Sequence, residues 1–333
     1  MSRIAILGGG SWGTALAILF SRTREEHELF LWARSAELVS AMREKRENAI
    51  YLPGQTIPNS VLITSNLEEA INRAEIVVGA IPSEFARAVY GAAAPHLSSE
   101  TIFISATKGL EPRTRARMSE VIAQTTKRRT ARIAVLSGPS FALEAARGEP
   151  TAVVLACADE RVAVVLQEKL GSRAFRLYTN TDVLGVELAG AMKNVIAIAA
   201  GACQGLGLGA NTLAALITRG LAEMTRLAVS QGARPEALSG LAGLGDLVLT
   251  CTGALSRNRL VGIELGKGHP LMGILANMKM VAEGVGTAAS LLALAREKQV
   301  EIPITEQVNA ILHEGKSPAE AIREIMERPQ KRE

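Results

Sequence analysis

The chain has 333 residues, of which 48% are hydrophobic and 21% charged, a composition typical of a soluble globular protein with two domains. The formal net charge is only +4 and aromatic residues make up 3%, which argues against a nucleic-acid surface built on aromatic stacking but suits small anionic ligands. Three cysteines without CxxC spacing and four histidines without ligand spacing predict neither a disulfide nor a metal site.

The N-terminal stretch MSRIAILGGG has four apolar residues before its first glycine, too few for a signal peptide. Unpaired cysteines are also typical of a reducing compartment. We therefore expect a cytoplasmic protein.

Eight short apolar segments in the first half of the chain predict β-strands separated by helices. They cover residues 3–7, 28–32, 61–64, 75–81, 101–106, 132–137, 151–156 and 174–179. Continuous apolar strands of this kind are typical of a parallel sheet with helices on both faces. After residue 180 only Ala/Leu/Gly-rich helical periodicity remains. The sequence thus predicts an α/β domain of the Rossmann type, with a doubly wound and mostly parallel sheet, over residues 1–180, and an all-helical domain over 181–333.

The segment RIAILGGGSWGTALAILF has the spacing GxGxxG at Gly8, Gly10 and Gly13, directly after the first predicted strand and at the start of a helix. In that context the glycines allow a tight turn, a close approach of the backbone to a pyrophosphate, and close packing of helix on strand. The amides of the helix N-terminus would bind the phosphates. The pattern favours a dinucleotide cofactor over a glycine-rich turn without a ligand.

The next predicted strand is followed by Arg34, where an enzyme that binds the ribose of NAD usually has an acidic residue. A guanidinium there suits the 2′-phosphate of NADP. The arginine could equally be a solvated surface residue. NADP(H) is therefore favoured, and NAD(H) stays possible.

The segment GVELAGAMKNVIAIAAGA, residues 185–202, predicts a buried helix because it is apolar nearly all round, yet Lys193 lies at its centre. No tyrosine is followed by lysine four residues later and no histidine lies in a relay context, so lysine is the remaining candidate for the proton carrier. The charge also interrupts the apolar run that a membrane span needs. We expect no membrane-spanning segment.

The face of this helix that carries Lys193 holds small residues, which would let a ligand approach the ammonium. They are Ala189, Gly190, Ala197, Ala200 and Gly201. Two alternatives to catalysis stay open: Lys193 forms a structural ion pair, for example with Glu187, or it reaches the rim of the fold.

Polar residues recur in the segment GLAGLGDLVLTCTGALSRNRLVG, residues 240–262, where Asp246 follows a glycine turn. Ser256, Arg257 and Asn258 place a hydroxyl, a guanidinium and an amide in succession, which suits a phosphate. The alternative is that Ser256 caps a helix and Arg257 is solvated.

Together these segments resemble the bacterial-type family of NAD(P)-dependent glycerol-3-phosphate dehydrogenases. The matches span nearly the whole chain in the expected order: GGGSWGTALA, NAIYLPG, ATKGLEP, SGPSFALEAARGEPTA, GVELAGAMKNVIAIAAGACQGLGLGANTLAALITRGLAEM, GLAGLGDLVLTCTGALSRNR and VAEGVGTA. Gly253 departs from the family, which has serine there, and residues 268–279 match least. The resemblance implies reversible reduction of dihydroxyacetone phosphate to sn-glycerol 3-phosphate, which supplies phospholipid synthesis, and a homodimer is expected.

The resemblance also implies roles for individual residues. Lys193 would be the proton donor and acceptor. Substrate contacts would be Lys108, Gly138, Ser140, Lys193, Asp246, Ser256, Arg257 and Asn258. Besides Gly8, Gly10 and Gly13, cofactor contacts would be Ser11, Trp12, Arg34, Lys108, Ala142, Arg257, Val281 and Glu283.

Two other functions are compatible with the residues. One is a lysine-dependent reductase of the β-hydroxyacid or ketopantoate type, which binds carboxylates. The other is a regulatory protein that senses the nicotinamide cofactor without turnover.

Overall fold

The computed structural model describes residues 1–127, 132–278 and 280–330. The chain forms two compact units, Met1–Glu187 and Leu188–Glu333. We call them unit 1 and unit 2. The boundary predicted from the sequence, after residue 180, lies slightly earlier, at the end of the last strand.

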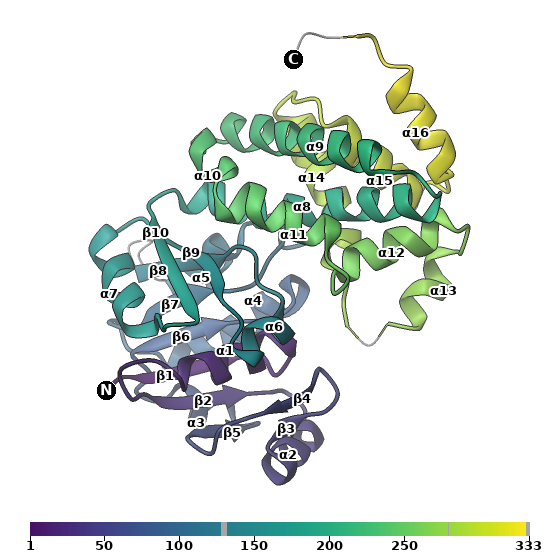
Figure 1. The fold of residues 1–333 in the computed structure, drawn as a ribbon. Coiled ribbons are helices and arrows are strands. Elements are labelled where there is room, and N and C mark those ends of the chain that lie inside the picture. The colour runs from purple at the N-terminus through teal and green to yellow at the C-terminus, as the bar shows by residue number, and fades with distance from the viewer. Residues whose placement is uncertain (128–131, 279, 331–333) are drawn as a thin grey trace. The chain divides into compact units, whose positions relative to one another are not determined.

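Unit 1 is built on an eight-stranded sheet with the order β10-β9-β8-β7-β6-β1-β2-β5 (Figure 1). The strands are β1 (Arg3–Leu7), β2 (Glu28–Trp32), β5 (Val61–Thr64), β6 (Ile76–Gly79), β7 (Ile102–Ser105), β8 (Ile133–Ser137), β9 (Thr151–Cys157) and β10 (Phe175–Asn180). All neighbours pair in parallel except β8 and β9. The predicted strands and the mostly parallel sheet are confirmed.

Helices cover both faces of this sheet. They are α1 (Ser11–Phe20), α2 (Ala36–Lys45), α3 (Leu67–Ile71), α4 (Ser83–Ala93), α5 (Met118–Thr126), α6 (Ala142–Arg147) and α7 (Glu160–Leu170), with a 3₁₀ turn at Ala94–His96. In β1, Ile4 and Ile6 join a buried apolar cluster with residues of α1, α6 and α7, whereas Leu7 joins a second cluster with residues of α3, α4 and α5. This alternation is that of a strand between two layers, so the doubly wound arrangement is confirmed.

A two-stranded antiparallel hairpin, β3 (Glu47–Asn48) with β4 (Leu52–Thr56), lies outside the main sheet and was not predicted. Its second strand contains Pro53 and Gly54, which weaken a strand signal. The hairpin matters for function because Asn48 reaches the glycine-rich turn.

Among its described residues, unit 2 contains helices joined by turns and loops and no strands, as predicted. Its helices are α8 (Val183–Gly205, which begins in unit 1), α9 (Ala210–Ser230), α10 (Pro235–Ser239), α11 (Asp246–Thr252), α12 (Arg257–Gly266), α13 (Leu271–Ala276), α14 (Glu283–Glu297), α15 (Pro303–His313) and α16 (Pro318–Met326). A π-helical turn, Leu241–Gly245, leads directly into α11.

Helix α8 packs against α12 through glycines on both helices. A Cβ atom on Gly201 would lie 2.0 Å from the carbonyl oxygen of Arg259, and one on Gly262 would lie 2.0 Å from that of Ile198. This corrects one expectation: at Gly201 the small residue admits the backbone of a neighbouring helix, not a ligand. The same close approach recurs one turn later, at Gly205 and Gly266.

By length and composition alone, α8 is apolar enough to cross a membrane in spite of Lys193. However, 83% of its most apolar window is buried within the protein, as in the core helix of a globular fold.

Candidate active site

The glycine-rich turn between β1 and α1 is shaped by contacts that only glycine permits. Gly8 has φ +130°, and a Cβ atom on it would lie 2.3 Å from the carbonyl oxygen of Ala80. A Cβ on Gly13 would lie 1.9 Å from the carbonyl oxygen of Gly8, whereas Gly10 faces open space. No side chain caps α1 at Gly10. The turn is therefore tight at its base and open at the helix N-terminus, an arrangement that can bind a phosphate.

Asn48, a residue that the sequence analysis did not single out, holds this turn from the β3–β4 hairpin. It is fully buried, and its Nδ2 donates to the carbonyl oxygen of Gly9 at 2.9 Å and to Oγ1 of Thr14 at 2.8 Å. Its Oδ1 accepts from the amide of Tyr51 at 3.2 Å. In the sequence Asn48 is the first residue of the family-matching segment NAIYLPG, and an asparagine shortly before Pro-Gly is otherwise common to many turns.

Three further predicted cofactor residues lie near the start of a helix in unit 1. Trp12 is in the first turn of α1, and its Nε1 is buried without a hydrogen-bond partner among the described residues. Ala142 is the first residue of α6. Arg34 lies between β2 and α2, is exposed, and places its guanidinium 5.4 Å from the ring centroid of Phe85. The orphaned indole N–H is a donor that a bound ligand can satisfy.

The three predicted substrate residues of unit 1 meet at one carbonyl group. Lys108 Nζ and Ser140 Oγ both donate to the carbonyl oxygen of Gly138, at 3.0 and 2.8 Å. Gly138 follows β8 with φ +135°, a conformation that favours glycine. The structure therefore brings these three residues together, with an ammonium and a hydroxyl at the same carbonyl oxygen.

In unit 2, Lys193 is buried, with 6% of its surface exposed. Its Nζ donates to Oδ1 of Asp246 at 2.6 Å and to Oγ1 of Thr250 at 2.7 Å. Asp246 and Thr250 are buried as well. Of the two alternatives drawn from the sequence, the structural ion pair stays open, with Asp246 and not Glu187 as the partner, whereas Lys193 is buried and does not reach the rim. It forms an ion pair with another predicted site residue.

Asp246 and Thr250 reach Lys193 because they lie one turn apart on α11. The π-helical turn before Asp246 is a feature often found at functional sites. The sequence analysis missed Thr250; its spacing of four from Asp246 was the available signal. Their neighbour Cys251 is fully buried, and burial raises the pKa of its thiol to about 12, so it is no nucleophile.

The consecutive residues 256–258 do different things. Ser256 Oγ caps α12 by accepting from the amide of Arg259 at 3.2 Å, as the alternative from the sequence proposed. Arg257 is half-buried rather than solvated, and its Nη1 donates to the carbonyl oxygen of Val281 at 2.7 Å. Asn258 Oδ1 accepts from the amide of Gly284 at 2.9 Å. Two of the three side chains therefore bind residues 281–284 at the start of α14, a stretch that includes the predicted residues Val281 and Glu283.

Gly284 is the point at which three helices of unit 2 converge. A Cβ atom on it would lie 2.7 Å from the carbonyl oxygen of Asn194 and 2.8 Å from Oδ1 of Asn258. The start of α14 is thus packed beside the residue that follows Lys193 and beside the N-terminus of α12. This brings the predicted residues of 256–258 and 281–283 next to the lysine helix.

Comparison with known proteins identifies the family. A model of the N-terminus of NAD-dependent glycerol-3-phosphate dehydrogenase matches residues 3–163, and a model of its C-terminus matches residues 182–323. The chain belongs to this family.

Relatives in the glycerol-3-phosphate dehydrogenase family match over their full length. The chain is 54% identical over 331 residues to glycerol-3-phosphate dehydrogenase (NAD(P)+) of Koribacter versatilis, covering 99% of this chain and 98% of that protein. It is 52% identical over 335 residues to the protein of the same name from Acidobacterium capsulatum, covering 99% of each. A crystal structure of glycerol-3-phosphate dehydrogenase from Coxiella burnetii has a TM-score of 0.93 at 40% identity, covering 98% of this chain and 99% of that one.

These matches confirm the family resemblance and the oxidoreductase class predicted from the sequence. The reductases of the ketopantoate type are not favoured, since the full-length relatives carry the glycerol-3-phosphate dehydrogenase name. Among the described residues, no three His, Cys, Asp or Glu side chains form a group that could hold a metal ion.

Proposed function

We propose that the protein catalyses the reversible NAD(P)H-dependent reduction of dihydroxyacetone phosphate to sn-glycerol 3-phosphate and so supplies glycerophospholipid synthesis in the cytoplasm. The observation that carries the proposal is the buried ammonium of Lys193 on α8, held by Asp246 and Thr250 on α11, all within the region that the C-terminal family model matches. We also expect a homodimer, which light scattering on the purified protein tests.

The residues of unit 1 fit a dinucleotide. The open N-terminus of α1 beyond Gly10 suits a pyrophosphate, and the orphaned Nε1 of Trp12 is a donor in need of an acceptor. Ser11 and Ala142 would contact the cofactor from the starts of two helices. When bound, the cofactor supplies the hydride that is added to the ketone carbon.

NADP(H) is the favoured cofactor because no acidic residue ends β2. Arg34 stands there instead, exposed and next to the ring of Phe85. A guanidinium is a good partner for a 2′-phosphate and has no partner on the bare ribose of NAD.

Substrate binding is assigned to two sets of residues. Lys108, with Gly138 and Ser140, contributes an ammonium from unit 1. Arg257 contributes a planar guanidinium from unit 2, whose remaining N–H groups suit the substrate phosphate. Holding the phosphate orients the ketone, and fixed orientation removes much of the entropic part of the barrier.

Lys193 is assigned the proton transfer. As the ketone is reduced, negative charge develops on its oxygen, and the ammonium both stabilises that charge and donates the proton. Asp246 and Thr250 orient Nζ by accepting hydrogen bonds from it, and the ammonium carries three N–H donors with which to serve these residues and the substrate. In the reverse direction the neutral amine takes the proton from the alcohol.

The test is the absorbance of NADPH and of NADH during incubation with dihydroxyacetone phosphate. We expect oxidation of the cofactor with this substrate and none with 2-ketopantoate. Cofactor binding without any oxidation would contradict the proposal and would favour a nicotinamide-sensing protein.

A further inference from the structure

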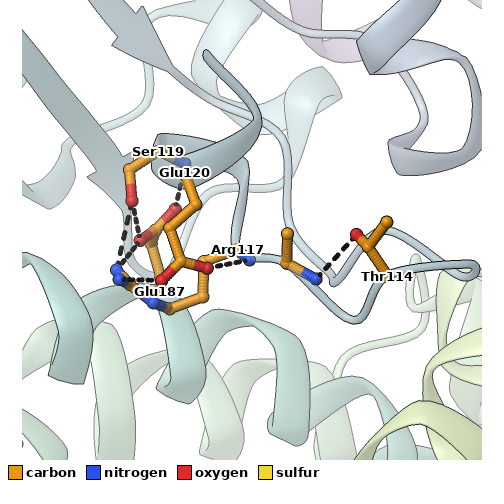
Figure 2. A network of polar contacts seen from close by, with 6 residues as sticks. Thr114, Arg117, Ser119, Glu120 and Glu187 are labelled. Atoms are coloured by element: carbon orange, nitrogen blue, oxygen red, sulfur yellow. Dashed lines mark hydrogen bonds and ion pairs between the residues drawn. The ribbon is translucent and has the colours of Figure 1, made fainter. Parts of the chain in front are cut away.

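Glu187 lies near the start of α8 and accepts hydrogen bonds from three donors in unit 1. Figure 2 shows its carboxylate facing Arg117 and Ser119. Arg117 Nη1 donates to Oε2 at 2.7 Å, the amide of Ser119 donates to Oε1 at 2.8 Å, and Ser119 Oγ donates to Oε2 at 2.6 Å. The first turns of α8 are therefore fixed to the N-terminus of α5.

Arg117 is itself held in place. Its Nη2 donates to Oε1 of Glu120 at 2.7 Å, and its amide donates to Oε2 of the same residue at 2.9 Å. A guanidinium that is already bound to Glu120 loses less further freedom when it also binds Glu187. The network is thus a rigid connection and not a loose surface pair.

The same network continues to the segment that carries Lys108. Leu110 forms a β-bridge with Arg117, and the amide of Glu111 donates to the carbonyl oxygen of Ala116 at 2.9 Å. The carboxylate of Glu111 binds Arg87 through two hydrogen bonds of 2.6 and 2.7 Å. The loop between Lys108 and α5 is therefore braced at both ends.

Helix α8 carries this connection onward to Lys193. The helix runs without interruption from Val183 to Gly205, and Lys193 lies roughly 9 Å along the axis from Glu187 at about 1.5 Å per residue. The network therefore anchors the first turn of the same helix that carries Lys193.

We propose that Glu187 is a positioning residue for the reaction: through Arg117 and Ser119 it fixes the first turn of the helix that carries Lys193. The inference rests on the proposed function, since it concerns the helix of Lys193, the residue to which the proton transfer is assigned. Stability alone does not explain a buried carboxylate at position 187, because a buried ion pair is often no more stabilising than apolar residues of the same size. A fixed geometry is what such a network supplies.

The structure offers a matched control in Glu223, on α9. It too is a buried carboxylate with three donors, accepting from the amides of Ile304 and Thr305 at 2.8 and 2.9 Å and from Oγ1 of Thr305 at 2.6 Å. It caps α15, which carries no residue assigned to the reaction. Loss of its charge tests the effect of a damaged buried network alone.

The experiment compares Glu187→Gln and Glu223→Gln with the parent protein at a temperature at which all three are folded. We expect both variants to lower the melting temperature. Only Glu187→Gln should lower kcat, by roughly tenfold, while its KM for NAD(P)H stays at the parental value, because misplacement of a reacting group slows chemistry without weakening cofactor binding.

An unchanged kcat in Glu187→Gln, or an equal loss of kcat in Glu223→Gln, would overturn the inference. If Glu187→Gln does not fold, Ser119→Ala removes only one donor and must lower kcat in the same selective way. Failure of the proposed function is seen separately, as a parent protein that oxidises no cofactor with dihydroxyacetone phosphate.

Discussion

Asn48 is the side chain on which the shape of the glycine-rich turn depends. Its side-chain amide donates hydrogen bonds to the carbonyl oxygen of Gly9 and the hydroxyl of Thr14, and Asn48 is fully buried. Asn48→Leu keeps the volume but leaves two buried polar groups unpaired, at about 1–3 kcal/mol for each. We expect the KM for NAD(P)H to rise by roughly tenfold or more, with a smaller change in kcat.

The matched control for Asn48 is Asn277→Leu. Asn277 is exposed and donates only to the carbonyl oxygen of Gly273, at 2.9 Å, at the end of α13. Steady-state kinetics of both variants decide the matter: equal KM values for NAD(P)H in the two would show that Asn48 does not shape the cofactor site.

Arg34, which follows β2, sets the preference for NADPH over NADH if its guanidinium binds the 2′-phosphate. Arg34→Ala should raise the KM for NADPH and leave that for NADH unchanged, because only NADPH has a 2′-phosphate to lose its partner. The readout is the ratio of kcat/KM for the two cofactors. A ratio equal to the parental one would show that Arg34 is a surface residue that merely stacks near Phe85.

At the scale of residues, the sequence predicted Lys193 as unusual but could not predict its partner. A lysine in an apolar helix is a local signal, whereas Asp246 lies on another helix, and only the fold brings the two together. Glu187 was a poor candidate for the partner of Lys193 because the two side chains lie on different faces of α8. At about 100° per residue, its side chain lies about 120° around α8 from that of Lys193.

At the scale of elements, the contact between α8 and α12 depends on glycine. Gly201→Ala would place a Cβ atom 2.0 Å from the carbonyl oxygen of Arg259, which is backbone and cannot turn away. The helices must move apart, so we expect the free energy of unfolding to fall by about 1–3 kcal/mol. Chemical denaturation measures it.

Gly91 provides the control for this substitution. It lies in α4, and a Cβ atom on it meets nothing within 4 Å. Gly91→Ala should therefore leave stability equal or raise it by up to about 1 kcal/mol, because alanine favours the helix more than glycine does. If Gly201→Ala is tolerated as well as Gly91→Ala, close contact between α8 and α12 is not required.

The strands of unit 1 were predictable because each is a short run of apolar residues, a signal contained in the segment itself. Strand direction is not local in this sense. Nothing in residues 151–156 indicates that β9 runs antiparallel to β8, since an apolar strand can pair either way. The β3–β4 hairpin was hidden because Pro53 and Gly54 are disfavoured in strands.

At the scale of the whole molecule, the assigned residues divide between the two units. The glycine-rich turn and the Lys108 cluster belong to unit 1, and the Lys193 cluster belongs to unit 2. Helix α8 begins in the first and continues into the second, so no Gly- or Pro-rich linker marks the boundary. The boundary predicted from the sequence therefore lies at residue 180, where the last strand ends and before α8 begins.

The catalytic role of Lys193 is the central claim, and the structure changes what its removal should do to the fold. Lys193→Met leaves the buried Asp246 without its counter-charge, so the variant should be less stable than the parent. Turnover must therefore be expressed per folded molecule. Lys316→Met is the matched control, because Lys316 also forms an ion pair, with Glu324 at 2.7 Å, and has no role in the reaction.

The most direct test is the turnover number of Lys193→Met with saturating NADPH and dihydroxyacetone phosphate, measured with thermal unfolding on the same preparation. We predict a fall of ~10²–10⁴ per folded molecule, the range typical of a lost general acid, with Lys316→Met at the parental rate. A folded fraction of Lys193→Met that turns over near the parental rate would contradict the account, because Lys193 would then be only the partner of Asp246.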